Sequence, residues 1–494
     1  MKRAKILSAV LAAALLLAGC SDNTETPNDD KDNSVSNSEN NNNKNDGNSD
    51  NSENEPPMTV EDIFNGVEFV TPDTASFTYD YDEKANGIKI TGYNGSEPNI
   101  EIPETIEGAK VISVRLVGNK VIKNVDIPNS VTEIGDRAFS SCTSLTSITI
   151  PDSVTSIGDY TFSGCESLTS ITIPDSVTSI GKQAFMRCTS LTRINIPDSV
   201  TRIRGGAFYD CTNLTDVNLG NGIIAIESNY NSTYYGMFEH CTSLKSITIP
   251  DSVGKIDDEA FYGCTSLESI TIPDSVTWIG DGAFCKCTNL TDVNLGKSIY
   301  IGSSVYEHGV FEDCESLTSI NIPDSVQVIG GCAFKNCTSL KSITIPDSVT
   351  EIGDEAFYGC TSLESITIPD SVTELGGGAF YKCTNLTDVN LGNGIYSLRY
   401  YHREGRWDGR SPFLGMFEDC ESLTSITIPD SVTSIGEQAF MNCTSLTNVT
   451  IPDSVTKIEN SAFYDCQNIQ VTYKNKIYDY GQLVNLRAEI ERSL

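Results

Sequence analysis

The sequence contains few of the residues that carry metal or nucleic-acid chemistry. Its 494 residues include only three His and two Trp, and its 33 Lys and Arg face 67 Asp and Glu, a formal net charge of −34. The scarcity of His argues against a histidine-rich metal centre. The acidic excess argues against binding of nucleic acid, which needs clustered Lys and Arg, and against docking of the folded part on an anionic lipid surface. No long apolar run follows the N-terminal segment, so no spanning helix is predicted there.

Catalytic motifs are also missing. Neither G-x-S-x-G nor H-E-x-x-H occurs in the chain. Gly-Lys-Ser at 296–298 lacks the Gly five residues earlier that a phosphate-binding loop requires, because position 291 is Thr. We therefore predict a non-catalytic protein with no cofactor and no metal site.

The N-terminus has the pattern of a secretory signal. Lys2, Arg3 and Lys5 precede an apolar stretch from Ile6 to Leu17, which is too short for a stable membrane span. The stretch ends in Leu-Ala-Gly-Cys at 17–20, which resembles a bacterial lipobox. That resemblance implies removal of residues 1–19 and acylation of Cys20; the alternative is an ordinary cleaved signal followed by a chance Cys.

Residues 20–57 form a second segment of unusual composition. From Ser21 to Pro57 the chain is dominated by Asn, Ser, Asp and Glu, and Val35 is its only large aliphatic residue. Such a segment cannot bury enough apolar surface to offset the entropy of ordering, so we expect it to be disordered. As a flexible coil it would span about 30–35 Å and hold a folded domain away from the membrane.

The rest of the chain is repetitive. Cysteines recur at a fixed place, and the interval from Cys142 to Cys165 is repeated in ten of the thirteen steps, the other three being longer. This ladder consists of Cys142, Cys165, Cys188, Cys211, Cys241, Cys264, Cys287, Cys314, Cys337, Cys360, Cys383, Cys420, Cys443 and Cys466. Ile-Pro-Asp-Ser-Val occurs ten times, first at 150–154. A regular period of this length predicts a solenoid of stacked units.

One unit shows how the chain should run. In 145–150, Ile148 and Ile150 alternate with polar residues, which is typical of a half-buried strand. The following Pro-Asp-Ser predicts a turn, because Pro supplies no ladder N–H and Asp and Ser bond the local backbone. Val154 and Ile157 predict a second extended piece. Apolar residues then recur every three positions up to Leu168, so we expect a short helical turn to complete the unit.

The repeat resembles the bacterial Treponema-type (BspA-like) leucine-rich repeat. Its pattern, L-x-x-L-x-L-P-x-x-L-x-x-I-G-x-x-A-F-x-x-C, is matched by Leu168 to Cys188, and the similarity extends from Asp126 to Cys466. The resemblance implies a right-handed leucine-rich-repeat solenoid with parallel strands, a second short extended segment and short helical turns. It also implies a secreted or surface-held protein that binds other macromolecules, as members of the family are associated with adhesion.

Both ends of the repeats have the features of caps. At 58–125, an Asn-Gly turn at 86–87 between alternating strands predicts a hairpin over Phe77 to Tyr93, and 102–106 is a degenerate copy of the Pro turn. The repeats should occupy 126–468. At 469–494, two short strands and a helical pattern at Leu483, Leu486 and Ile490 should cover the other end.

The cysteine ladder has three interpretations. Buried free thiols at a packing position is the simplest. Disulfides between neighbouring units, and a metal or redox array, remain as alternatives. Cys285 and Cys332 lie outside the ladder and are the thiols to test first for reactivity. The recurring Asp of the Pro turn, as in Asp152, should form an acidic row that caps turns or, alternatively, collects Ca²⁺.

Three units are longer than the rest because they carry insertions, near 224–236, 299–309 and 395–415. All three begin with the same altered unit, such as Leu-Gly-Asn-Gly-Ile at 219–223, so they should emerge on one side of the solenoid. Their aromatic and Arg side chains are of the types that dominate binding hot spots. The predicted binding residues are Tyr230, Tyr234, Tyr235, Tyr306, Arg399, Tyr400, Tyr401, Arg403, Arg406, Trp407 and Arg410. Alternatively, these loops fold back as lids.

The predicted function follows from these features. We expect a lipid-anchored protein on the bacterial cell surface that mediates adhesion, binding a host or neighbouring-cell protein or glycan and touching the membrane only through its N-terminal lipid. The insertions are one candidate surface, and the hydroxyl-lined strand face, with Ser147 and Thr149, is the second. The alternative function is an envelope scaffold or a glycan-capture protein.

Overall fold

The structure is a computed structural model that describes residues 64, 66–228, 235–298, 300–302, 308–398 and 414–492. The predicted signal, the acylated Cys20 and the tether lie outside the described residues. Within the described part, no helix is long and apolar enough to cross a membrane.

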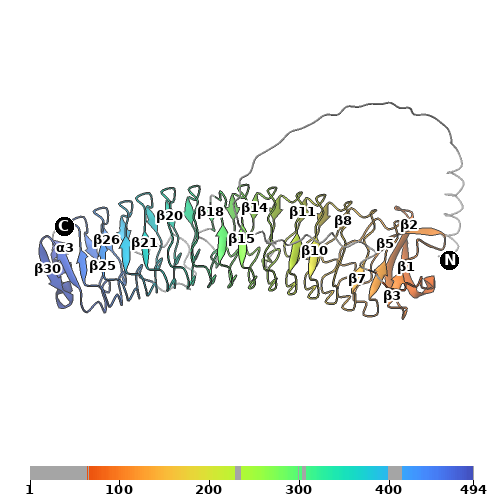
Figure 1. The fold of residues 1–494 in the computed structure, drawn as a ribbon, viewed down its shortest axis with the longest axis horizontal. Coiled ribbons are helices and arrows are strands. Elements are labelled where there is room, and N and C mark those ends of the chain that lie inside the picture. Colours follow the sequence, from red (N-terminus) through yellow and green to blue (C-terminus); the bar gives the residue numbers. More distant parts are fainter. Residues whose placement is uncertain are drawn as a thin grey trace, which may run out of the picture.

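The repeats stack into an elongated parallel β-solenoid, with β1 near one end and α3 at the other (Figure 1). The first strand of each unit pairs in parallel with the same strand of the next, as Ile194 does with Val217. Isolated bridges such as Thr248–Thr271 join the ladder where regular strands are interrupted. The strands of this first ladder are β3 (Asn99–Glu101), β6 (Asn124–Asp126), β7 (Ser147–Ile148), β10 (Arg193–Asn195), β12 (Asp216–Asn218), β15 (Ser269–Thr271), β17 (Asp292–Asn294), β21 (Ser365–Thr367), β23 (Asp388–Asn390), β25 (Ser425–Thr427), β27 (Asn448–Thr450) and β29 (Gln470–Tyr473).

A second parallel ladder runs beside the first and confirms the second extended segment. Each of its strands is two residues long and points its Ile or Leu into the core, as Ile256 does beside Ile279. It follows the Pro turn, so each unit changes direction between its two strands. Its strands are β8 (Ser156–Ile157), β9 (Ser179–Ile180), β11 (Arg202–Ile203), β13 (Ala225–Ile226), β14 (Lys255–Ile256), β16 (Trp278–Ile279), β18 (Tyr300–Ile301), β19 (Val328–Ile329), β20 (Glu351–Ile352), β22 (Glu374–Leu375), β24 (Ser397–Leu398), β26 (Ser434–Ile435) and β28 (Lys457–Ile458).

The short helical turn expected on the third side of each unit is absent from the described repeats. This side consists of consecutive turns instead. Two positions in a typical unit have left-handed backbone, for example Gln183 (φ 52°) and Arg187 (φ 58°), which a right-handed helix does not allow. N–H groups along this side donate to the next unit instead of to their own, as Phe185 N does to Ala207 O at 2.8 Å. Hydrogen bonding between neighbouring units therefore replaces the hydrogen bonding of a helix.

The core consists of columns of identical side chains. From Phe139 to Phe463, neighbouring Phe rings stack nearly parallel with centroids 5.3–5.6 Å apart. The ladder cysteines beside them are buried free thiols, which confirms the simplest interpretation. Each donates to a carbonyl of the preceding unit at 2.9–3.3 Å, as Cys264 Sγ does to Phe238 O. Burial raises the pKa of the Cys264 thiol to about 12.

The predicted elements at both ends are present. At the N-terminal end, η1 (Thr74–Ser76) leads into an antiparallel hairpin of β1 (Phe77–Asp82) and β2 (Gly87–Tyr93). The last two residues of the degenerate Pro turn form β4 (Thr105–Ile106), which makes a second hairpin with β5 (Ala109–Val114). At the C-terminal end, β29 pairs with β30 (Lys476–Asp479), and η2 (Tyr480–Gln482) continues into α3 (Leu483–Arg492).

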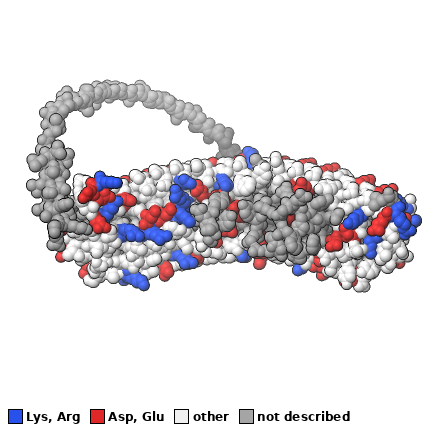
Figure 2. All heavy atoms as spheres, turned by 180° about the vertical axis from the view of Figure 1, so that it is seen from behind, with Lys and Arg blue, Asp and Glu red and all other residues white. Residues whose placement is uncertain are grey.

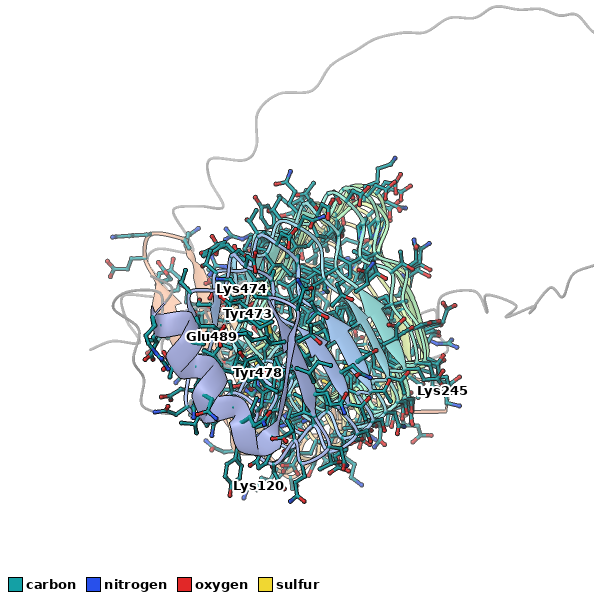
Figure 3. All side chains as sticks on the ribbon, turned by 90° about the vertical axis from the view of Figure 1, so that its left-hand side faces the viewer. Lys120, Lys245, Tyr473, Lys474, Tyr478 and Glu489 are labelled. Atoms are coloured by element: carbon teal, nitrogen blue, oxygen red, sulfur yellow. The ribbon has the colours of Figure 1, made fainter. Side chains whose placement is uncertain are left out.

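The C-terminal helix lies across one part of the open end of the stack (Figure 3). α3 buries Leu486 and Ile490, two of the three residues whose spacing predicted it. Its Glu489 accepts hydrogen bonds from Lys476 Nζ at 2.7 Å and from Tyr478 Oη at 2.6 Å. These contacts hold the helix against one face of β30 at the C-terminal end of the stack.

Candidate interaction surface

Of the eleven predicted binding residues, only Tyr235 lies within the described part of the chain. The other ten, namely Tyr230, Tyr234, Tyr306, Arg399, Tyr400, Tyr401, Arg403, Arg406, Trp407 and Arg410, lie outside the described residues. The structure does describe the residues from which each insertion leaves the solenoid and those at which it returns.

All three insertions occupy the same place in their units. They follow β13, β18 and β24 of the second ladder and end before Phe238, Phe311 and Phe417 of the Phe column. Because the strands and the Phe rings stack in register, the three departure points lie along one side of the solenoid. The expectation that the insertions begin from one side is therefore confirmed for their described ends.

A shared Gly-x-x-Glu pattern receives each returning chain, and the sequence reasoning missed it. Gly236, Gly309 and Gly415 each donate a backbone N–H to the Glu three residues later, with N–O distances of 2.9, 3.1 and 2.9 Å. The acceptors are Glu239, Glu312 and Glu418. A Cβ on any of the three glycines would lie 1.7 Å from a carbonyl oxygen of the following unit, so no other residue fits there.

A second glycine, in the unit before each insertion, completes what we term the loop seat. Gly206, Gly282 and Gly378 have left-handed backbone (φ 63–70°) at a position that carries a side chain in most other units. The residue just before each returning Gly packs over the space left by the missing side chain. Its Cβ would lie 3.0–3.1 Å from a Cβ added to Gly206, Gly282 or Gly378. These packed residues are Tyr235, His308 and Leu414. Each loop seat thus comprises two Gly, one Glu and one packed residue.

An aromatic row joins the first two loop seats. Its members are Tyr235, Tyr209, His240, Tyr262 and His308. Ring centroids of successive members are 4.6, 5.8, 5.5 and 5.5 Å apart. All five side chains are half-buried, so each stays partly exposed to solvent. Half-exposed aromatic groups held by neighbouring units form a rigid contact surface at little cost in side-chain entropy.

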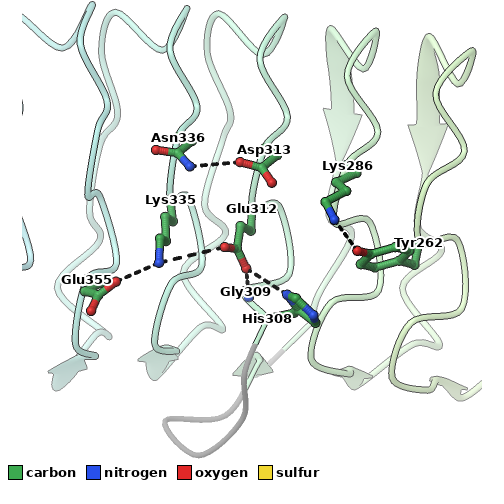
Figure 4. Close-up of polar contacts among 9 residues, drawn as sticks. All are labelled: Tyr262, Lys286, His308, Gly309, Glu312, Asp313, Lys335, Asn336 and Glu355. Atoms are coloured by element: carbon green, nitrogen blue, oxygen red, sulfur yellow. Dashed lines mark hydrogen bonds and ion pairs between the residues drawn. The ribbon is translucent and has the colours of Figure 1, made fainter. Parts of the chain in front are cut away.

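Lysines continue this row toward the C-terminus. Lys286 Nζ lies 4.8 Å from the centre of the Tyr262 ring and donates a hydrogen bond to the Tyr262 hydroxyl. Lys335 Nζ lies 2.8 Å from Glu355 and 3.9 Å from Glu312, so it connects the second loop seat to the next unit (Figure 4). In the view of Figure 2, the Lys and Arg of the described residues lie among Asp and Glu and do not form a separate basic field.

Comparison with known proteins places these features in a family. The BspA type leucine rich repeat region, in six copies, matches residues 111–234, 224–309, 306–402 and 415–484. The chain belongs to this family.

Two solved structures illustrate the similarity. A leucine-rich repeat protein from Bacteroides ovatus is 31% identical, with 80% of this chain and 91% of that chain covered and a TM-score of 0.60. A leucine rich cell surface protein from Faecalibacterium prausnitzii is 32% identical, with 84% and 97% covered and a TM-score of 0.45. No curated protein matches the chain. The BspA-type family consists of leucine-rich repeat proteins that are generally not enzymes, and membership suggests a protein-binding role.

Within this BspA-type repeat, the three loop seats differ in charge. Burial raises the pKa of Glu239 from 4.5 to about 8 and also raises the pKa of Glu418. The second seat is more polar, because Glu312 also faces His308 Nδ1 at 3.3 Å and Lys335. The hydrogen bond with Glu312 raises the pKa of His308. Burial opposes the charge of Lys335, but its ion pairs outweigh that effect and raise its pKa.

The strand face of the BspA-type repeat is the second candidate surface. Its outward side chains are polar and hydrogen-bond along the stack, as Asn218 Nδ2 does to Asn195 Oδ1 at 2.6 Å. The expectation for Ser147 and Thr149 was wrong, because both side chains are buried, and Thr149 Oγ1 donates to Asp126 at 2.7 Å. The Asp row of the Pro turns is also present, and Asp198 accepts from the backbone N–H of Asn221 in the next unit at 2.8 Å. These groups are engaged with one another, whereas the rings of the aromatic row are partly exposed to solvent.

Proposed function

We propose that this protein is a lipid-anchored, non-catalytic repeat protein of the bacterial cell surface that binds another macromolecule through its loop-bearing side. The single observation that supports this most strongly is the loop seat. The same arrangement of two Gly and one Glu recurs at all three insertions. Insertions without a shared role would not be expected to have the same loop seat at all three places.

The aromatic row supports the same surface from within the described residues. It runs beside two of the loop seats and is flanked by Lys286 and Lys335, so this side combines partly exposed aromatic rings with both charges. Aromatic and Arg side chains are enriched among residues that dominate binding energy. The partner that fits is a protein or glycan on a host or neighbouring cell, contacted by the insertions and the aromatic row together.

The first experiment restores the regular period without touching a loop seat. Deleting Arg399 to Pro412 returns the third inserted unit to the length of a regular unit while keeping Leu414, Gly415 and Glu418. We expect the variant to keep its circular dichroism spectrum and melting temperature, and to lose at least about tenfold in affinity for partners identified on host-matrix and glycan arrays.

A matched control shortens a different insertion. Deleting Ser303 to Tyr306 returns the second inserted unit to the regular length in the same way. If the third insertion is the main contact, this control should bind nearly as well as the unaltered chain. Unchanged affinity after both deletions, with intact folding, would exclude these two insertions and leave the aromatic row and the strand face as the candidate binding surfaces.

The anchor is tested separately. Replacing Cys20 with Ala should abolish incorporation of labelled fatty acid and release the protein from cells. Retention of the label would contradict acylation at Cys20, and loss of the label without release of the protein would contradict anchoring through this lipid. The alternative function, an envelope scaffold or glycan-capture protein, is favoured if the arrays give only glycan ligands or none.

A further inference from the structure

One thiol on the loop-bearing side is unlike those of the ladder. Cys285 directly follows Phe284 of the Phe column, a position occupied elsewhere by Ser, Met, Tyr, Glu or Lys. Its side chain is fully buried (0% exposed). Every ladder thiol donates a hydrogen bond to a carbonyl of the preceding unit, but among the described residues Cys285 Sγ has no such partner. A buried thiol without a hydrogen bond is available for another interaction.

Two further donor groups converge on this thiol. Glu312 occupies the same position in the next unit, so stacking alone brings its carboxylate beside Cys285. His308 is the residue packed over Gly282 in the second loop seat, and its Nδ1 lies 3.3 Å from Glu312 Oε2. One ligand atom from each of Cys285, His308 and Glu312 lies within 4.8 Å of the other two.

We propose that Cys285, His308 and Glu312 form a binding site for a thiophilic divalent cation of the Zn²⁺ type. A thiolate, an imidazole nitrogen and a carboxylate oxygen are donors that Zn²⁺ takes at about 2.0–2.3 Å in tetrahedral sites. Binding releases to solvent the thiol proton and, where His308 is protonated, one imidazole proton, and the thiolate and carboxylate then balance the charge of the metal. A water molecule would complete the tetrahedron.

The geometry requires only a small adjustment. In a tetrahedral site with those bond lengths, ligand atoms are separated by roughly 3.3–3.8 Å. The ligand atoms of Cys285, His308 and Glu312 lie within 4.8 Å of one another, so the longest of these distances must shorten by about 1 Å. His308 can supply this movement, because it stands at the end of an insertion and is half-buried. Lys335 opposes a cation, since its Nζ lies 3.9 Å from Glu312, but its closer partner is Glu355 at 2.8 Å.

The other loop seats serve as internal comparisons. In the first seat, Glu239 lies 3.7 Å from His240, but the equivalent of Cys285 in the preceding unit is Tyr209. In the third seat the packed residue is Leu414 and the equivalent of Cys285 is Tyr381. Only the second of the three seats therefore combines thiol, imidazole and carboxylate, and a metal there would tie the second insertion to the body of the solenoid.

The test uses Co²⁺ alone as a probe, added to the metal-free full chain carrying Cys20→Ala so that the N-terminal thiol does not compete. We expect one equivalent to bind and to give the near-ultraviolet charge-transfer absorption of a cobalt–thiolate bond, which Zn²⁺ then abolishes. Cys285→Ala should remove the band and weaken binding at least about 100-fold, and His308→Gln should weaken it at least about tenfold.

Matched controls separate the site from unspecific binding. Cys332→Ala removes the other thiol outside the ladder, and His240→Gln removes the His of the first seat; both should leave the band and the stoichiometry unchanged. The proposal is overturned if Co²⁺ gives no thiolate band, or if Cys285→Ala and His308→Gln bind as well as their parent. Because both variants retain Glu312 and Gly309, their circular dichroism should confirm that the second seat is still folded. The outcome does not depend on whether the insertions bind a partner.

Discussion

The Phe column and the position directly after it are adjacent in every unit, yet the two behave in opposite ways. The Phe side chains are identical from Phe139 to Phe463, and their rings stack at constant spacing. The next position changes among Ser, Met, Tyr, Glu, Cys and Lys, and it supplies the loop-seat carboxylates, Cys285 and two of the five members of the aromatic row, Tyr209 and Tyr262. The constant position stabilises the solenoid, and the variable position carries the chemistry that distinguishes one unit from the next.

The largest expected effect lies in the constant column. Phe357 is fully buried between Phe334 and Phe380, with ring centroids 5.4 Å away on both sides. Phe357→Ala should lower the free energy of unfolding by about 3–5 kcal/mol, because a cavity opens in a stack that cannot close without shifting its neighbours. Tyr358→Ala, at the half-buried position that follows, is the matched control and should cost less than about half as much. Equal losses in urea unfolding would contradict the distinction between the two positions.

The loop seats should respond to a single added methyl group. In Gly309→Ala the new Cβ would lie 1.7 Å from Cys332 O, so the returning chain must move away from the next unit. We expect the free energy of unfolding, measured by thermal denaturation, to fall by about 2–3 kcal/mol. Gly254→Ala provides the control, since its Cβ would meet nothing closer than 3.9 Å, and it should be neutral or slightly stabilising. A neutral Gly309→Ala would mean that the seat is not a rigid receiving site.

The buried carboxyl of the first seat predicts a dependence on pH. Burial raises the pKa of Glu239 to about 8, so the folded state holds a proton that the unfolded state releases near 4.5. The stabilisation is therefore fully present below about pH 4.5 and is lost as the pH rises toward 8. Glu239→Gln still offers an oxygen to Gly236 N but does not ionise, so it should be more stable than its parent at pH 9 by on the order of 2 kcal/mol.

The measurement is the difference in melting temperature between Glu239→Gln and its parent across pH 5 to 9. That difference should grow with pH and level off above about 8. A constant difference over the whole range would show that the carboxyl of Glu239 titrates normally. It would also contradict the conclusion that the first loop seat is less polar than the second.

The sequence predicted the solenoid well because the fold depends on contacts that repeat. The period, both strand ladders, the burial of the ladder cysteines and the helix at Leu483–Arg492 all follow from apolar spacing within one unit or one cap. The prediction of a short helical turn on the third side was wrong, because apolar residues recur every three positions both in a helix and in a run of consecutive turns. Only the left-handed backbone at positions such as Gln183 distinguishes them.

The candidate site was predicted less well because its parts are far apart in the sequence. Each loop seat takes one Gly from the unit before the insertion and another Gly and a Glu from after it. Cys285 and His308 come together only because an insertion delivers the His above the preceding unit. The available signals were the G-x-x-E that follows every insertion and the replacement of a side chain by Gly at 206, 282 and 378. The aromatic and Arg content of the insertions instead led to a prediction of binding residues within the insertions themselves.

The smallest effects should come from two hydroxyls of the same Pro turn. Ser199 Oγ, partly buried, donates to Val177 O at 2.8 Å, and the exposed Thr201 Oγ1 donates to Thr178 O at 3.4 Å. Ser199→Ala should cost about 1 kcal/mol in urea unfolding, because it leaves a partly buried carbonyl without its partner. Thr201→Val should cost less than about 0.5 kcal/mol, since water can replace the longer bond. If Thr201→Val were the more damaging change, the hydrogen bonds on the outer surface would contribute to the stability of the stack at least as much as those beneath it.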